Sequence, residues 1–187
     1  MRKNRQTGLS LLELMAVLTI VAILMGVGFA SFKGITTSYR ISGEINGLLG
    51  DMQYARSEAI KQGQSVAICV SSSGTDCATG DTSWNQGWIV FVEPSAGTVS
   101  TGGNAALVLR KQAAFSGSDT LTDGLTSNVV FDREGLALGL LTTMSGNGGA
   151  VLPLHDAANN ATRTRCLEVT NIGNVSVQQP ATLSTCS

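Results

Sequence analysis

The chain is poor in charged residues, has one histidine and lacks common catalytic motifs, and each shortage excludes a class of protein. Only 13% of its 187 residues are charged, with 12 basic against 13 acidic, so it is not a strongly basic nucleic-acid binder. The single histidine, His155, has no C-x-x-C pair to join it, which argues against a zinc site. No G-x-S-x-G motif occurs, and no glycine-rich stretch carries the G-K-[ST] of a P-loop. We therefore predict no enzymatic activity, no bound metal and no cofactor.

What the chain does have is a long apolar run near its start. Residues 1–8 are polar and basic, and the run from Leu9 to Phe32 contains a single charge, Glu13. At about 1.5 Å per residue this run can span a bilayer as a helix, whereas the apolar core of a secretory signal peptide has about 7–15 residues. A carboxylate costs about 2.5–3.5 kcal/mol at the centre of a spanning helix and less near its end. We therefore expect Glu13 to be functional, with its partner on another molecule.

The residues around Gly8 resemble the class III signal of type IV pilins and type II secretion pseudopilins. The resemblance rests on the stretch Thr7-Gly8-Leu9-Ser10-Leu11-Leu12-Glu13-Leu14, in which the acid is the fifth residue after the glycine. In that family a prepilin peptidase cleaves after the glycine and methylates the new amino terminus. The resemblance implies cleavage between Gly8 and Leu9, N-methylation of Leu9, and pairing of Glu13 with the amino terminus of a neighbouring subunit in the filament. An ordinary membrane anchor is the alternative reading of the same run.

The same resemblance divides the chain into three parts. Residues 1–8 would be the leader peptide, residues 9–33 a transmembrane and assembly helix, and residues 34–187 a periplasmic head that includes the second half of the helix. Three basic residues lie in the leader, on the short cytoplasmic flank, as the positive-inside rule expects. Without them nine basic residues remain against 13 acidic ones, which gives the mature chain a net charge near −4. We expect a single-pass protein of the bacterial inner membrane.

The four cysteines indicate a disulfide framework, because their number is even and the chain carries an export signal. Four cysteines allow three connectivities. We favour Cys69–Cys77 and Cys166–Cys186, since each pair closes a local loop. The second loop encloses about twenty residues, would contribute about 3 kcal/mol in the chain-entropy model, and would pin the C-terminal tail onto the head. Free buried thiols are the alternative.

Helical periodicity continues past the apolar run. Apolar residues recur at spacings of mostly three and four, and Gly63 provides a stop signal. We predict one long helix from about Leu9 to Gln62, whose second half packs on a sheet. The apolar stripe of that second half comprises Ile41, Ile45, Leu48, Leu49, Met52, Ala55, Ala59 and Ile60.

After Gly63 the pattern changes to short strands separated by loops, with no alternation of strands and helices. This pattern predicts an α+β fold in which an antiparallel sheet packs against the single helix. We expect Trp84 and Trp88 in the core, Gly146–Gly149 in a flexible loop and His155 in a polar loop. The expected strands are Ser65–Val70, Trp88–Glu93, Ala106–Lys111, Val129–Asp132, Arg165–Val169 and Val175–Gln178.

The head contains three distinctive segments: Met52–Ala59, Trp84–Phe91 with its W-x-x-G-W core, and Val130–Gly135. They resemble the GspH/FimT family of minor pilins and pseudopilins, including the FimU-like pilins. DNA-binding members of the FimT type carry a G-R-x-R motif near the C-terminal strand, but here the stretch reads Gly173-Asn174-Val175-Ser176. Arg163 and Arg165 lie nearby and offer at most a weak DNA contact, so we do not expect nucleic acid to be a principal partner.

The resemblance implies a minor pilin or pseudopilin, which is a structural subunit. We expect it to help initiate a type IV pilus for adhesion, motility or DNA uptake, with its head near the filament tip. The alternatives are an H-type pseudopilin of type II secretion and a DNA-binding pilin of natural transformation. The implied partners are other major and minor pilins, met through the N-terminal helix, together with the prepilin peptidase and the inner-membrane assembly platform.

Overall fold

A computed structural model describes residues 10–78, 80–93, 107–121, 127–138, 149–179 and 186, without the side chains of residues 27–33. The chain divides into two compact units, Met1–Tyr39 and Arg40–Ser187. The predicted span at residues 9–33 therefore lies partly outside the described residues. Among those described, no helical segment combines the length and the apolar character that a bilayer crossing demands.

The longest element is helix α1 (Leu11–Gln62). It ends at Gln62, just before Gly63, as predicted, and the φ of +65° at this glycine lies in the left-handed region that closes many helices. Ile60, which we placed on the buried stripe, is 54% exposed, because it lies about 100° around the helix from Ala59. The rest of the stripe is largely confirmed: the buried positions are Ile41, Ile45, Leu48, Met52, Ala55 and Ala59.

Two antiparallel sheets follow the helix, where the sequence led us to expect one. The first sheet has the strand order β3-β2-β1-β5-β6, and the short 3-10 helix η1 (Trp84–Gln86) leads into β2. Val66, Ile68 and Val70 of β1 face α1, while the alternate residues face the opposite side of the sheet. The strands are β1 (Ser65–Val70), β2 (Gly87–Glu93), β3 (Val108–Ala113), β5 (Asn128–Phe131) and β6 (Ala137–Leu138).

The second sheet has the order β4-β7-β8-β9, and its longest strand, β7, was not predicted. β7 begins at Gly149, in what we expected to be a flexible loop, and ends at His155, so the prediction of a polar loop at His155 was wrong. Leu152 and Leu154 point into the core from β7, and the alternation is hard to recognise in the sequence because Pro153 lies between them. The strands are β4 (Thr120–Leu121), β7 (Gly149–His155), β8 (Arg165–Thr170) and β9 (Val175–Gln178).

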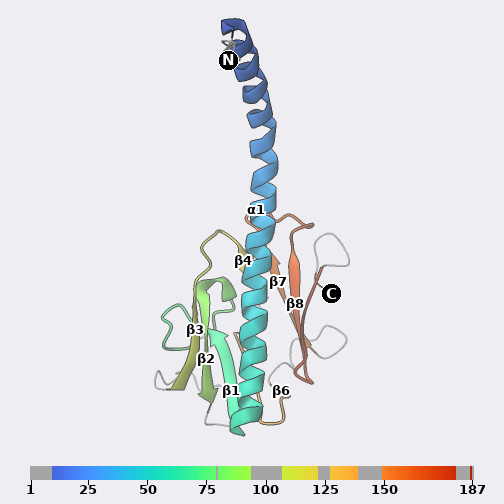
Figure 1. The fold of residues 1–187 in the computed structure, drawn as a ribbon. Coiled ribbons are helices and arrows are strands. Elements are labelled where there is room, and N and C mark those ends of the chain that lie inside the picture. The colour runs from blue at the N-terminus through green and yellow to red at the C-terminus, as the bar shows by residue number, and fades with distance from the viewer. Residues whose placement is uncertain are drawn as a thin grey trace, which may run out of the picture. The chain divides into compact units, whose positions relative to one another are not determined.

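Both sheets share one hydrophobic core with the second half of α1. Figure 1 shows this half of the helix lying across the head, with β1–β3 on one side and β7–β8 on the other. Trp84 and Trp88 are buried in this core, as predicted. The predicted α+β class is confirmed, with two antiparallel sheets packed on the helix instead of one.

Candidate functional site

The described part of the first unit is a helix with apolar side chains on every side. Glu13 lies in its first turn and is exposed in the single chain. A helix that is apolar all round is stable only when other apolar groups surround it. The predicted cleavage site at Gly8–Leu9 lies outside the described residues. The exposed large apolar residues of this unit are Leu11, Leu12, Leu14, Met15, Val17, Leu18, Ile20, Val21, Ile23, Leu24, Met25, Ile35 and Tyr39.

Both disulfides link neighbouring parts of the head in the pairing that the sequence favoured. Cys69 of β1 is bonded to Cys77 in the loop that follows, and Cys166 of β8 is bonded to Cys186 near the C-terminus. The Cα atoms of each pair are 5.6 Å apart, which is within the usual range for a disulfide. The second bond therefore tethers the end of the chain to the second sheet.

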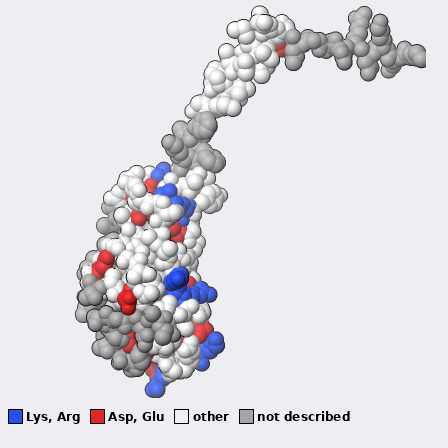
Figure 2. Space-filling model, turned by 90° about the vertical axis from the view of Figure 1, so that its left-hand side faces the viewer, with Lys and Arg blue, Asp and Glu red and all other residues white. Residues whose placement is uncertain are grey.

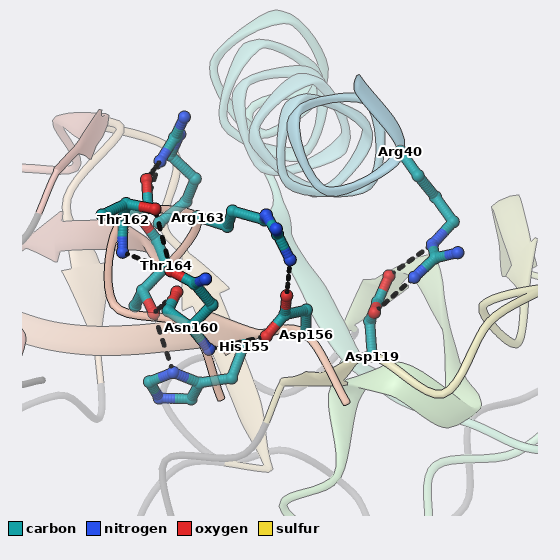
Figure 3. A network of polar contacts seen from close by, with 9 residues as sticks. Arg40, Asp119, His155, Asp156, Asn160, Thr162, Arg163 and Thr164 are labelled. Atoms are coloured by element: carbon teal, nitrogen blue, oxygen red, sulfur yellow. Dashed lines mark hydrogen bonds and ion pairs between the residues drawn. The ribbon is translucent and has the colours of Figure 1, made fainter. Parts of the chain in front are cut away.

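A partly buried ion pair joins the start of the second half of α1, at Arg40, to the segment before β4. The guanidinium of Arg40 donates two hydrogen bonds to Asp119, from Nε to Oδ2 at 2.6 Å and from Nη2 to Oδ1 at 2.7 Å (Figure 3). The Asp119 side chain is fully buried, and hydrogen bonding to it raises the pKa of Arg40 above its usual value. Glu44 lies one turn after Arg40, and its Oε1 is 4.0 Å from Arg40 Nε.

A second ion pair lies close by, after the end of β7. Arg163 Nη1 donates to Asp156 Oδ2 at 2.7 Å, and the backbone N–H of Asn160 donates to Asp156 Oδ1 at 2.7 Å (Figure 3). Burial works to raise the pKa of Asp156, but these hydrogen bonds outweigh it and hold that pKa below its usual value. His155 turns the other way, with Nδ1 3.1 Å from Thr164 Oγ1. No group of three or more potential metal ligands occurs among the described residues.

The two arginines considered for DNA contact are used within the head. Arg163 is paired with Asp156, which cancels its charge locally. Arg165 Nη1 donates to the backbone oxygens of Thr162 and Thr164. Figure 2 shows that on one face of the molecule basic side chains form only small groups, with acidic ones close by and much uncharged surface between them. This distribution does not resemble the continuous basic stripe of a nucleic-acid binder.

Arg56 is a positioning residue that the sequence did not reveal. It lies in the Met52–Ala59 segment, and its Nε donates to the backbone oxygen of Gly135 at 3.0 Å while Nη2 donates to that of Ile172 at 3.1 Å. Gly135 has a φ of +81°, so the turn after β5 needs a glycine there. The helix segment and the turn that resemble the pilin family are thus joined by one side chain.

Comparison with known proteins gave two family matches and two similar structures. The sequence model described as Type II transport protein GspH matches residues 44–173, and the prokaryotic N-terminal methylation motif matches residues 3–29. The fold is similar to that of the type IV minor pilin FimU of Pseudomonas aeruginosa PAO1 in two crystal forms.

In space group P21 the match has a TM-score of 0.53 at 20% identity and covers 74% of this chain and 87% of that chain. In space group P65 the values are 0.51, 19%, 71% and 88%. No match was found among curated proteins.

Proposed function

Because this chain belongs to the GspH family of type II transport proteins and is a structural pilin subunit, we propose that its specific role is to help initiate a type IV pilus. The observation that carries the proposal is a helix with apolar side chains on all described sides and one acid, Glu13, in its first turn. Such a helix is suited to a bundle with other pilin helices. The match of residues 3–29 to an N-terminal methylation motif supports the processing event that would create its assembly-competent end.

Glu13 would set the register of the bundle. A carboxylate that enters an apolar helix bundle needs a cationic partner, and breaking such a buried pair typically costs about 3–5 kcal/mol. Cleavage between Gly8 and Leu9 would supply the cation as the N-methylated amino terminus of Leu9 in a neighbouring subunit. A subunit could then join only where its carboxylate meets an amine.

The proposed role places the protein first in the membrane and then in the filament. It would first reside in the bacterial inner membrane as a single-pass protein with its head in the periplasm. The prepilin peptidase would trim it there, and the assembly platform would deliver it to the filament, close to the tip. Its partners would be other major and minor pilins. The disulfide that tethers the C-terminus is suited to the oxidising periplasm and to the outside of the cell, where a covalent bond keeps the tail attached.

The second candidate is the H-type pseudopilin of a type II secretion system. The description of the matched family, type II transport protein, favours it directly. The same helix and the same acid would serve there, so the two candidates differ in the filament they join and not in the chemistry of assembly.

One experiment separates the candidates. Pili are sheared from cells that lack the gene and from the same cells complemented with the wild type, Glu13→Ala or Glu134→Ala, the last being an exposed acid of the head. We expect strong loss of pili without the gene, restored by the wild type and by Glu134→Ala but not by Glu13→Ala.

Mass spectrometry of the Glu13→Ala protein should still find N-methylated Leu9 at its start, which would show that processing is intact. Normal piliation in the deletion strain together with lost export of folded proteins would favour the secretion system. Full restoration of pili by Glu13→Ala would refute the register role.

A further inference from the structure

Acidic side chains outnumber basic ones around Arg40 and Glu44, at the start of the second half of α1. Arg40 faces two carboxylates, those of Asp119 and Glu44. A second arginine nearby, Arg163, is already paired with Asp156 (Figure 3). If all these groups are ionised, the cluster therefore has three negative charges and two positive ones, and Glu44 has the surplus charge.

The geometry gives Glu44 only weak compensation. The nearest atom of Arg40, Nε, is 4.0 Å from Glu44 Oε1 and already donates to Asp119 at 2.6 Å. The Glu44 side chain is only 11% exposed, and neither of its oxygens has a hydrogen-bond partner. An ionised carboxylate in this position would be desolvated, would accept no hydrogen bond and would share its only nearby cation with Asp119, which is unfavourable.

A proton removes the surplus charge without opening the head. It turns Glu44 from an acceptor into a donor, and it removes the repulsion between the two carboxyl groups. We propose that Glu44 is a proton-binding site of the head, and that the bound proton stabilises the clamp by which Arg40 holds the Asp119 segment against α1. This proposal is independent of the filament to which the protein belongs.

The surrounding charges give the pH range of the effect. Burial raises the pKa of Glu44 most, the negative charge of Asp119 adds to it, and Arg40 opposes both, so the pKa reaches about 7. Of the neighbouring elements, the Asp119 segment contributes Asp119, and the turn after β7 contributes Asp156 with its partner Arg163.

An unfolded glutamate binds its proton only below about 4.5. The stabilisation is therefore complete below pH 4.5 and is lost as the pH rises through about 7.

The packing around Arg40 explains why its contact with Asp119 responds to the ionisation of Glu44. A side chain built on Gly117 would lie 2.9 Å from the guanidinium of Arg40, so the segment before β4 passes directly over that group. When Glu44 ionises, Arg40 is attracted by two carboxylates that repel each other. The segment should then open more often, beginning at Asp119.

The test uses the full chain in nonionic detergent, with thermal unfolding followed by tryptophan fluorescence between pH 5.5 and 8.5. We expect the Tm of the wild type to fall by about 4–8 °C over this range, since the proton stabilises the folded head about 30-fold at pH 5.5 and is almost fully released at pH 8.5. Glu44→Gln mimics the protonated form, so its Tm should match the wild type at pH 5.5 and exceed it at pH 8.5.

Glu58→Gln is the matched control. Glu58 lies on the same helix and is 12% exposed, but Lys61 and Gln62 hydrogen-bond to its oxygens and its pKa is lowered. Its variant should keep the wild-type pH dependence. A Glu44→Gln variant with that same dependence would overturn the proposal.

If Glu44→Gln fails to fold, carboxyl 13C NMR of the wild type decides the question. The chain has six glutamates, and the signal of Glu13 can be identified from a Glu13→Gln sample. One other glutamate should titrate with a midpoint near neutral pH. Midpoints at or below 4.5 for all five would rule out a proton held by Glu44.

Discussion

Replacing Arg40 with alanine should destabilise the head far more than the same change at Arg56 on the same helix. Asp119 has no exposed side-chain surface and receives both of its short hydrogen bonds from Arg40. Loss of the guanidinium leaves a buried carboxylate without its cation, which costs about 3–5 kcal/mol. At about 2–4 °C per kcal/mol for a chain of this size, the Tm should fall by roughly 6–20 °C.

Arg56→Ala is the variant against which the stability loss of Arg40→Ala is compared. It donates to two backbone oxygens, and the loss of those hydrogen bonds leaves neutral acceptors near the surface that water can reach. The cost there should be about 1–2 kcal/mol. The assay is thermal unfolding of the full chain in detergent at pH 7.5, read by tryptophan fluorescence, because both tryptophans, Trp84 and Trp88, are buried in the head.

A double variant tests whether the stranded charge of Asp119 causes the loss of stability. Adding Asp119→Asn to Arg40→Ala replaces the stranded charge with a neutral amide and should recover part of the lost Tm. If Arg40→Ala costs no more than Arg56→Ala, or if Asp119→Asn gives no rescue, the ion pair is not what holds the segment before β4 on the helix.

Two further predictions concern the disulfides and DNA. Replacing both cysteines of the Cys166–Cys186 pair with alanine should cost about 3 kcal/mol in urea unfolding. The shorter Cys69–Cys77 loop should cost somewhat less, because its loop closure entropy is smaller while Cys69 and Cys166 are both buried; a much larger loss at that pair would contradict this ranking. Gel shifts with double-stranded DNA should show no salt-dependent binding at physiological salt. A shift that disappears in the Arg163→Ala, Arg165→Ala double variant would show that the internal pairing of these arginines does not prevent contact.

The helix and the first sheet were predictable because their patterns are strong. The stripe of α1 follows a clear helical period, and the core strand Trp88–Glu93 is continuous and rich in β-branched residues. Trp84 and Trp88 were expected in the core for their size, and both are buried there. In these segments local preference and tertiary packing agree.

Only two of the four strands of the second sheet were predicted from the sequence. β8 and β9 were predicted, but β7 contains Gly149 and Pro153 and starts in a glycine-rich stretch, so its signal resembles that of a loop. It forms because β8 supplies a complete partner strand, from Gly149 opposite Thr170 to Leu154 opposite Arg165. That pairing is tertiary and has no local signature.

The polar cluster of the head could be recognised only in part. Arg40 and Glu44 are four residues apart, so a contact between them could be expected from helical geometry alone. Asp119 is 79 residues further along the chain than Arg40 and lies in a segment with no distinctive pattern. Only the fold brings the second carboxylate to the same guanidinium.

The position of α1 at the start of the chain also constrains when the head can fold. Its buried stripe shares a core with Val169 of β8 and Val175 of β9, which are among the last parts of the head to be synthesised. An N-terminal fragment that stops before β8 leaves part of that stripe exposed to water. Core closure must therefore wait for nearly the whole polypeptide, and such long-range contacts make folding slow compared with a helical bundle. For a head proposed to reach the periplasm, this delay keeps the polypeptide unfolded while it is still being threaded across the membrane.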